Sequence, residues 1–540
     1  MSRLSKHGEK VTAKVNEFAE TSVENFMGGN SYTLNPIDTL KIVAASSIFG
    51  EPQYYRDGID AKKTISNEMT LREYSIFSDL VKDKKSVADV FTEVIDNALT
   101  FDFGKTLEIA LELRTDYFMR LNPSVIFVRA SIHPERVQYN TDYPGKMKEI
   151  GKAISMRPDD LTNQFEYYMY VKGSKKGLSS IVKRTWSEKL QEYSRYQLNK
   201  YKGKRLIDLV RISHASSTTI DELMKTGTLE VTETEQTWES LRSAKKTWIE
   251  IMDTIRIPHM ALLRNLRGIF TEIDDKKITE KVCNELKSGV IKGKQFPFRY
   301  WSAYKAIEAT DIRNKRTVLD TLEECIDIAV ANMPKIPGTV ACLSDNSGSA
   351  WGSFNSEYGS VTVAEIANLS SLITAQQADE GHVGVFGDRL SMQGVSKRNG
   401  LLTQLQETSS RGKAQGGGTE NGIWLFWDKA IKNKEHWDTV FIYSDMQAGH
   451  GNLYGTDSSA YSKYLHKKGG SYIDVLALVE KYRATVNPKV NVFSVQVAGY
   501  NNSVLPENLY RGAILSGWTG KEPLYARAII DAWDQAEQRK

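Results

Sequence analysis

The sequence predicts a protein of two parts, an all-α stack of amphipathic helices over residues 1–335 and an α/β doubly wound domain over residues 336–540. Three observations predict this multidomain fold class. Apolar residues in the first part recur with the period of an α-helix. Two prolines and a glycine at 334–338 are typical of a linker. After them, short apolar runs alternate with helical segments, which is the pattern of a parallel sheet covered on both faces.

The helices of the first part are predicted from their apolar faces. Residues 87–99 follow the i, i+3, i+4, i+7 template without a miss, and a similar face recurs over 319–330. Short breaks such as Asn122-Pro123 separate such segments, because proline ends a helix and biases the preceding residue to extended backbone. Many amphipathic helices with short breaks favour a solenoid of stacked helix pairs.

The second part is predicted to alternate strands with helices. The expected strands are 339–343, 383–386, 439–443 and 490–497, and the expected helices are 361–375, 423–432, 473–483 and 524–538. Open α/β sheets bind ligands beyond the carboxyl ends of their strands, so polar residues that follow these strands are the candidates for a site.

Composition excludes several classes of protein. No run of 18 or more apolar residues occurs, and the first ten residues lack the apolar core of a secretory signal, so we expect no membrane partner and a cytoplasmic location. Cys283, Cys325 and Cys342 are too scattered for a disulfide framework or a metal cluster. The net charge of +4 is modest, but its distribution is uneven.

Oxygen-bearing side chains follow the expected strands of the second part. Asp345, Ser347 and Ser349 form an Asp-x-Ser-x-Ser turn, Thr419 ends a glycine loop before a helix, and Asp445 follows a later strand. Oxygen donors without histidine or cysteine suit a small octahedral ion, so we expect Mg²⁺ or another divalent cation in this surface loop. The alternative is that these residues only form turns and cap helices.

The segment 171–214 is strongly basic. It holds twelve Lys or Arg and three acids, a net charge of +9, which is a footprint that attracts phosphates. Aromatic residues are interleaved and could stack on unpaired bases: Trp186, Tyr193, Tyr196 and Tyr201. The alternative is a solvated lysine-rich helical face. In such a face, glutamates four residues from the lysines usually pair with them, and few acids occur here. The predicted RNA-binding cations are Lys172, Lys175, Lys176, Lys183, Arg184, Lys200, Lys202, Lys204 and Arg205.

Signals of catalysis are weak. Gly104-Lys105-Thr106 is similar to the end of a phosphate loop, but the first glycine and a preceding strand are missing. No His-Glu-x-x-His, Cys-x-x-Cys or Gly-x-Ser-x-Gly motif occurs. Three hypotheses remain: an RNA-binding scaffold, a protein-binding adaptor that holds an acidic partner through its metal, and a nuclease using Asp345 and Asp445. A nuclease would want a larger carboxylate cluster, so we expect no enzyme and no catalytic residue.

Several motifs, in their order, resemble the Ro autoantigen family, in particular its bacterial type. They are Gly28–Tyr32, Lys200–Lys202, Asp208–His214, Ala261–Leu266 and the three turns of the candidate metal site. The resemblance covers nearly the full length. It implies a ring of HEAT-like helices, called the TROVE module, joined to a von Willebrand factor A domain with a metal-ion-dependent adhesion site. The chain departs from the family at Glu420, where relatives have Asp, and in an insertion at 451–470.

The resemblance also implies a function. Ro proteins bind a small non-coding Y RNA on a basic outer surface and single-stranded 3′ ends of structured or misfolded RNA in the ring. Bacterial relatives can be tethered through that RNA to an exoribonuclease, which is consistent with a role in RNA quality control. An RNA-binding histidine of the family matches His214, and basic positions match Lys200, Lys204 and Arg205. A second basic cluster could line the ring or form a packed turn: Lys292, Lys294 and Arg299, beside Phe296, Phe298 and Tyr300.

Overall fold

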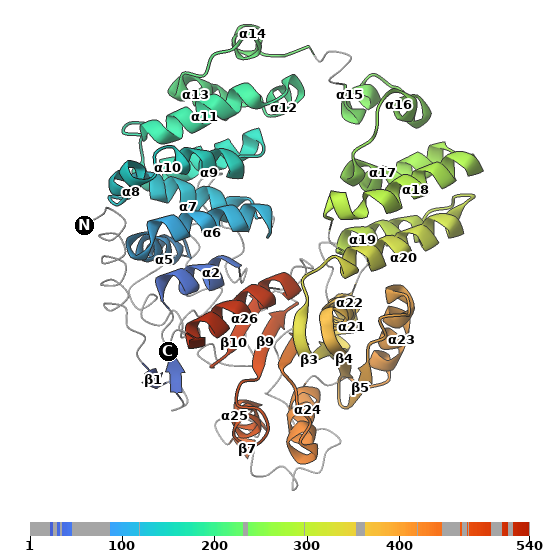
Figure 1. Cartoon of the computed structure of the whole chain (residues 1–540). Helices are drawn as coiled ribbons and strands as arrows, with labels where there is room; N and C mark the ends of the chain where they lie inside the picture. The colour runs from blue at the N-terminus through green and yellow to red at the C-terminus, as the bar shows by residue number, and fades with distance from the viewer. Residues whose placement is uncertain are drawn as a thin grey trace. The chain divides into compact units, whose positions relative to one another are not determined.

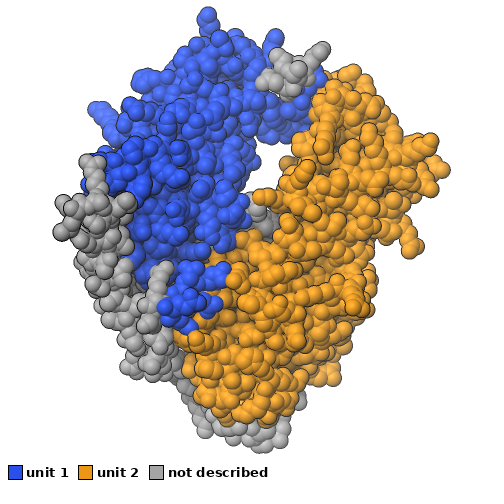
Figure 2. Space-filling view, in the orientation of Figure 1, with its two compact units in different colours: residues 1–240, 531–540 blue, residues 241–530 orange. Residues whose placement is uncertain are grey.

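The computed structural model describes most of the chain. The described residues are 22–24, 30–32, 35–45, 87–117, 119–230, 236–295, 297–352, 362–417, 420–444, 465–466, 472–473, 475–497, 510–516 and 522–538. They divide into two compact units, which Figure 2 shows in different colours. Unit 1 is Met1–Ser240 with Asp531–Lys540, and unit 2 is Leu241–Ile530.

Unit 1 is built of helices that pack against their neighbours in a stack (Figure 1). Two three-residue strands, β1 (Ser22–Glu24) and β2 (Asn30–Tyr32), pair antiparallel near its beginning. Its described helices are α2 (Pro36–Ala45), α5 (Val87–Phe101), α6 (Phe103–Thr115), α7 (Leu121–Ile132), α8 (Arg136–Asp142), α9 (Lys146–Ile154), α10 (Pro158–Lys172), α11 (Ser180–Glu192), α12 (Arg195–Lys200), α13 (Lys204–Ser213) and α14 (Thr218–Thr226).

The apolar periodicity over 87–99 predicted α5 correctly. In α5 the template residues Val94, Ile95 and Leu99 are almost completely buried. The carboxylate of Asp102 accepts a hydrogen bond of 2.9 Å from the backbone N–H of Lys105, which satisfies one of the open donors at the start of α6. A capped helix start at α6 and a buried apolar stripe on α5 therefore both stabilise this part of the helical stack.

Unit 2 begins with helices of its own, which are followed by a sheet. The backbone N–H of Leu401 donates to Asp327 at 3.1 Å, so the last helix before the sheet contacts a helix that follows it. The helices and the sheet consequently form one compact unit, and the boundary predicted at 335/336 stays a prediction. The helices before the sheet are α15 (Trp238–Ser243, which spans the division between the units), α16 (Trp248–Thr254), α17 (His259–Glu272), α18 (Lys276–Gly293), α19 (Pro297–Glu308) and α20 (Lys315–Ala331).

The sheet of unit 2 has six strands in the order β10-β9-β6-β3-β4-β5. All neighbours pair parallel except β4 and β5. The strand β3 begins inside the expected linker at 334–338, and its register shifts between Ile336 and Thr339. The strands are β3 (Ile336–Asp345), β4 (Ala378–Phe386), β5 (Leu390–Gly394), β6 (Thr439–Ser444), β9 (Asn491–Gln496) and β10 (Gly512–Ser516).

Helices cover both faces of this sheet. Trp424 and Trp427 of α24 pack with Val479 of α25 over one face, in a core that also includes Leu343 and Ile442. On the other face, the hydroxyl oxygens of Thr374 in α22 and Tyr443 in β6 lie 2.6 Å apart. The remaining elements are α21 (Gly348–Gly352), α22 (Val363–Gln377), α23 (Leu401–Lys413), α24 (Glu420–Asn433), α25 (Val475–Thr485), α26 (Glu522–Gln538) and a short pair of strands, β7 (Leu465–His466) and β8 (Tyr472–Ile473).

The predicted fold class is therefore confirmed: a helical repeat followed by a doubly wound sheet. The expected strands and helices of the second part are all present with somewhat different ends. The sequence did not predict β5, β10 or α23. Among the described residues, no helix has the length and apolar character needed to span a membrane.

Candidate nucleic-acid interface and metal centre

The basic segment lies on α10–α13 of unit 1. Of the ten predicted RNA-binding side chains, Lys183 is half-buried and that of Lys204 lies outside the described side chains; the others are exposed. The exposed ones are Lys172, Lys175, Lys176, Arg184, Lys200, Lys202, Arg205 and His214. The sequence thus predicted their solvent accessibility, which any phosphate contact requires.

Several of these cations converge around one buried ring. The Lys175 ammonium and the Arg205 guanidinium each lie 5.9 Å from the centre of the Phe165 ring. Lys175 also pairs with Asp208 of α13 at 2.9 Å, so the loop after α10 contacts the first turns of α13. This brings Lys172, Lys175 and Lys176 near Arg205, whereas Lys200 is directed elsewhere, toward Glu239 at 3.1 Å.

Acids from outside the segment neutralise part of its charge. Because they are distant in the sequence, the count of +9 over 171–214 does not include them. Burial raises the pKa of the Glu166 carboxyl, while its partner Arg205 acts in the opposite direction. The pairs are Arg205–Glu166, Arg195–Glu222 and Lys200–Glu239.

Other basic residues of the segment have no such partner. Their side chains form no hydrogen bond or ion pair with any residue that the structure describes, and all but Lys183 are exposed. We call them the unpaired basic residues. They are Lys172, Lys176, Lys183, Arg184, Lys202, Arg211 and His214.

His214 occupies the C-terminal end of α13. It is the C-cap residue, with a left-handed φ of 54°, and its N–H donates to the carbonyl of Val210. Its imidazole is exposed, so His214 is not a buried structural histidine. The backbone reversal at the end of the ten-residue α13 therefore presents this ring to solvent.

Two of the four aromatic residues proposed for base stacking are core residues instead. Trp186 is fully buried and its indole N–H donates to Gln164 at 2.7 Å. Tyr193 is buried as well, and its hydroxyl donates to the carbonyl of Ser155 at 3.0 Å. The stacking prediction is wrong for both because a helix needs one apolar stripe, and these rings supply it. Tyr196 and Tyr201 are half-exposed and remain accessible.

The second basic cluster ends α18 and begins α19. Lys292, Lys294 and Arg299 are exposed, whereas Phe298 and Tyr300 are buried. Phe296 lies outside the described residues. The described aromatic residues of this cluster are thus core residues of α19, and its cations face solvent.

The Asp-x-Ser-x-Ser turn follows β3 but is not a surface loop. Asp345 and Ser347 are fully buried. One carboxylate oxygen of Asp345 accepts from the backbone N–H of Ser347 at 2.9 Å, and the other accepts from the hydroxyl of Ser444 at 2.7 Å. The expectation of exposure is wrong because Asp345 ends β3, a central strand that is flanked by β6 and β4.

The glycine loop lies against this turn. The N–H of Gly348 donates to the carbonyl of Gly417 at 2.9 Å. Asp388, which the sequence analysis missed, accepts from the N–H of Gly417 at 3.1 Å. Gly416 has a φ of +94°, a conformation that L side chains rarely adopt. These contacts fix the loop two residues before Thr419.

The three predicted parts of the metal site therefore converge as far as they are described. Ser444 contacts Asp345 directly and precedes Asp445 by one residue. Thr419, Asp445 and the side chain of Ser349 lie outside the described residues and side chains, so their placement stays a prediction. The described donors, a carboxylate and serine hydroxyls, fit a hard divalent cation. Among the described residues, no group of three or more His, Cys, Asp or Glu gathers as a metal site.

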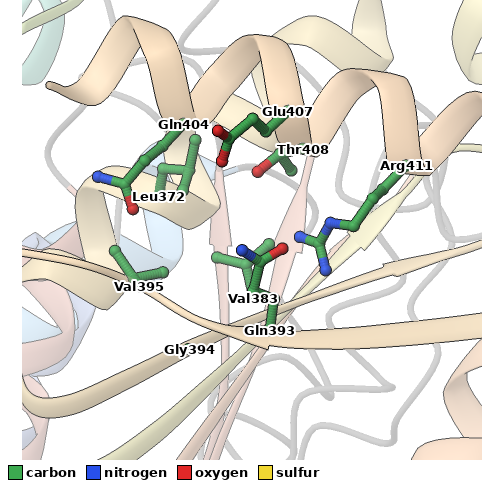
Figure 3. Close-up of a pocket in the computed structure, with 9 residues that line it drawn as sticks. All are labelled: Leu372, Val383, Gln393, Gly394, Val395, Gln404, Glu407, Thr408 and Arg411. Atoms are coloured by element: carbon green, nitrogen blue, oxygen red, sulfur yellow. The ribbon is translucent and has the colours of Figure 1, made fainter. Parts of the chain in front are cut away.

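A small cavity lies under α23 in the same domain (Figure 3). It has room for about one water molecule. Glu407, Thr408 and Arg411 of α23 line it opposite Gln393 of β5. Burial lowers the pKa of Arg411, and its buried Nε has no hydrogen-bond partner among the described residues. The cavity suits a bridging water rather than an organic ligand.

Comparisons with known proteins agree with this architecture. The family model of the TROVE domain matches residues 222–333, which lie within the predicted module. The structure is similar to the crystal structure of the Ro (RSR) protein of Deinococcus radiodurans, with a TM-score of 0.58 and 15% sequence identity. The match covers 82% of this chain and 93% of that chain. The chain therefore matches the TROVE domain over residues 222–333 and, over most of its length, has the fold of that bacterial Ro protein.

Proposed function

We propose that this chain is an RNA-binding scaffold, rather than an enzyme, and that it binds RNA through the basic surface of α10–α13. The observation that carries the proposal is the set of unpaired basic residues, which are displayed on three helices and the loops between them. Cations without an internal partner are available to phosphates at no cost of breaking an ion pair. The TROVE domain and the Ro-type fold support RNA as the kind of partner.

The finer proposal follows the Ro resemblance. The basic surface binds a small non-coding, Y-like RNA, mainly through its phosphates, and the helical module takes single-stranded 3′ ends of structured or misfolded RNA. Phosphate contacts fix the position of an RNA without reading its sequence, which suits a protein that accepts many defective RNAs. An exoribonuclease tethered through the bound RNA would then act on these RNAs in quality control.

The second part of the proposal is a divalent cation at the carboxyl edge of the sheet. Asp345, Ser347, Ser349, Thr419 and Asp445 would hold Mg²⁺, some of them through water. Its supports are the oxygen character of the described donors and the contacts that tie Asp345 to Ser444 and Gly348 to Gly417. Such an ion would present an open coordination position to an acidic group of a partner.

Electrophoretic shifts with two matched RNAs test the RNA proposal. One RNA is a blunt duplex, and the other is the same duplex with a single-stranded 3′ tail. We expect tighter binding of the tailed RNA and a log–log salt slope of several units, as about six neutralised phosphates would give. Equal binding of both RNAs would overturn the 3′-end proposal. A flat salt dependence would overturn the basic surface.

A further inference from the structure

A buried network of amides and hydroxyls lies under the Asp-x-Ser-x-Ser turn. Asn346 occupies the position between Asp345 and Ser347, and its side chain is 1% exposed. Its amide nitrogen donates to the carbonyl oxygen of the Asn368 side chain at 2.9 Å, and its own side-chain oxygen accepts from Asn368 at 3.0 Å. The two side chains therefore hold each other in a reciprocal pair.

The same network reaches two more elements. Asn368 lies on α22, is completely buried, and accepts a further hydrogen bond of 2.7 Å from Ser344 of β3. It also donates to the hydroxyl of Ser409 on α23 at 3.3 Å. Both polar atoms of Asn368 are thus used, as a buried amide requires, and the pair joins β3, α22 and α23.

Fixing Asn346 restrains its two neighbours. The backbone N–H of Asn346 donates to the carbonyl of Phe386 at 2.8 Å, so its main chain and its side chain are both held. Asp345 and Ser347 lie one residue to either side, and a rotation of the Asn346 backbone would turn both of them. The network therefore decides how the Asp345 carboxylate and the Ser347 hydroxyl are presented.

Gly412 of α23 supplies the space that this arrangement needs. A Cβ at Gly412 would overlap the side chain of Asn346, which cannot move without losing its buried partners. A glycine within a helix ordinarily costs stability relative to alanine, so its presence here requires another reason. Close approach of α23 to Asn346 is that reason.

We propose that Asn368 and Gly412 are positioning residues, which hold Asn346 so that Asp345 and Ser347 keep the conformation that binds a divalent cation. This inference rests on the proposed metal site. Groups that orient metal ligands, without touching the metal, commonly change its affinity when they are substituted. Neither residue has a metal-ligating role in our assignment.

Calorimetric titration of the full chain with Mn²⁺ tests this inference through Asn368→Ala. We expect the dissociation constant to rise about tenfold or more, the effect typical of lost outer-shell support. Thr374→Ala is the matched control, because Thr374 is also fully buried on α22 and hydrogen-bonded but contacts Tyr443 instead of the turn. The control is expected to bind Mn²⁺ as the wild type does.

Gly412→Ala gives a second route that removes no hydrogen-bonding group. It should weaken Mn²⁺ binding to a similar extent, even though alanine in place of glycine should by itself stabilise the helix α23. In the metal-free protein, amide exchange at Ser347 should also accelerate in both variants, since that N–H depends on the Asp345 geometry.

The outcomes separate the two proposals. Wild-type Mn²⁺ affinity in Asn368→Ala and Gly412→Ala, together with loss of binding in Asp345→Ala, would overturn the positioning role and leave the metal site standing. No Mn²⁺ binding by the wild type would overturn both. If Asn368→Ala fails to fold, Gly412→Ala and the exchange rate at Ser347 decide.

Discussion

The basic surface of unit 1 and the Asp345 turn of unit 2 are built in opposite ways. The first displays exposed cations on separate helices and loops, and several of them have no partner among the described residues. The second buries its carboxylate completely and uses both of its oxygens in hydrogen bonds. Binding energy on the surface is shared among many weak contacts, whereas the turn depends on single groups. Substitutions should therefore act gradually on the surface and abruptly at the turn.

The largest effect is expected for Asp345. Replacing it with alanine should abolish Mg²⁺ or Mn²⁺ binding, and it also removes the acceptor for the Ser347 N–H and the Ser444 hydroxyl. Each lost buried acceptor costs about 1–3 kcal/mol, so the melting temperature should fall as well. Calorimetry and thermal melting measure the two effects. Asp345→Asn retains acceptor oxygen but not charge, so it should melt closer to the wild type while still failing to bind. Wild-type affinity in the asparagine variant would contradict the metal site.

The next largest effect is expected on RNA affinity, where unpaired and paired cations should contribute differently. Alanine at four unpaired positions should weaken RNA binding about a hundredfold at moderate salt and flatten the log–log salt slope by about three units. The matched variant removes four paired cations, the same change in charge, and should weaken binding only about tenfold. Electrophoretic shifts over a salt series would measure both, and equal losses would show that pairing does not matter. The unpaired set is Lys172, Lys176, Arg184 and Lys202, and the paired set is Lys175, Arg195, Lys200 and Arg205.

A smaller effect of opposite sign is expected at Glu166. Glu166→Gln removes one of the two acids paired with Arg205 and leaves Asp208 at 4.0 Å, so RNA affinity should rise about threefold at low salt. Glu272→Gln, which releases Arg242 in unit 2 in the same way, is the control and should have no effect. A fall in affinity with Glu166→Gln would mean that the ion pair orients Arg205 for RNA.

Acidification should reproduce the effect of Glu166→Gln. Burial raises the pKa of Glu166, so it takes up a proton at a higher pH than an ordinary glutamate does. As the pH falls through that pKa, Arg205 loses one of its two charged partners in the wild type, and Asp208 remains. The affinity ratio of the variant to the wild type should therefore shrink toward one on acidification. A ratio independent of pH in the same shift assay would contradict this coupling.

The smallest effect is expected when the metal site of unit 2 is disrupted and RNA affinity is measured. Chelation of divalent cations, or Asp345→Asn, should leave the dissociation constant for tailed RNA within about twofold of the wild type, because the basic residues that we propose to bind phosphates are in unit 1. The RNA must be one whose own fold does not need Mg²⁺. A loss of more than tenfold would mean that the metal edge takes part in RNA binding.

The sequence predicted the fold well where a pattern is local. The apolar stripe of α5 and the buried apolar runs of β3, β4, β6 and β9 are patterns of residues that are close together in the sequence. The edge strand β5 escaped prediction because its five residues are half-buried or exposed and lack an apolar run. The location of the unit division was also unpredictable, since it depends on contacts such as Leu401 with Asp327.

The two candidate sites stay predictions, and some of the contacts around them could not be predicted from the sequence. The basic segment and the Asp-x-Ser-x-Ser turn are contiguous in the sequence, whereas Glu166 and Glu239, which neutralise two of the cations, lie outside the segment. The same limit hid Asn368, which reaches Asn346 from another helix. A local signal did exist for Asp388, an acid two residues after the end of β4.

Photo-crosslinking tests the central claim most directly. The full chain would be irradiated in complex with an RNA that carries a photoreactive base in its single-stranded tail and another in its duplex, and crosslinked peptides would be identified by mass spectrometry. Our account predicts crosslinks within residues 172–214, with Tyr196, Tyr201 and His214 as exposed ring acceptors, and their loss when the four unpaired cations are replaced. Crosslinks confined to unit 2, unchanged in that variant, would contradict it.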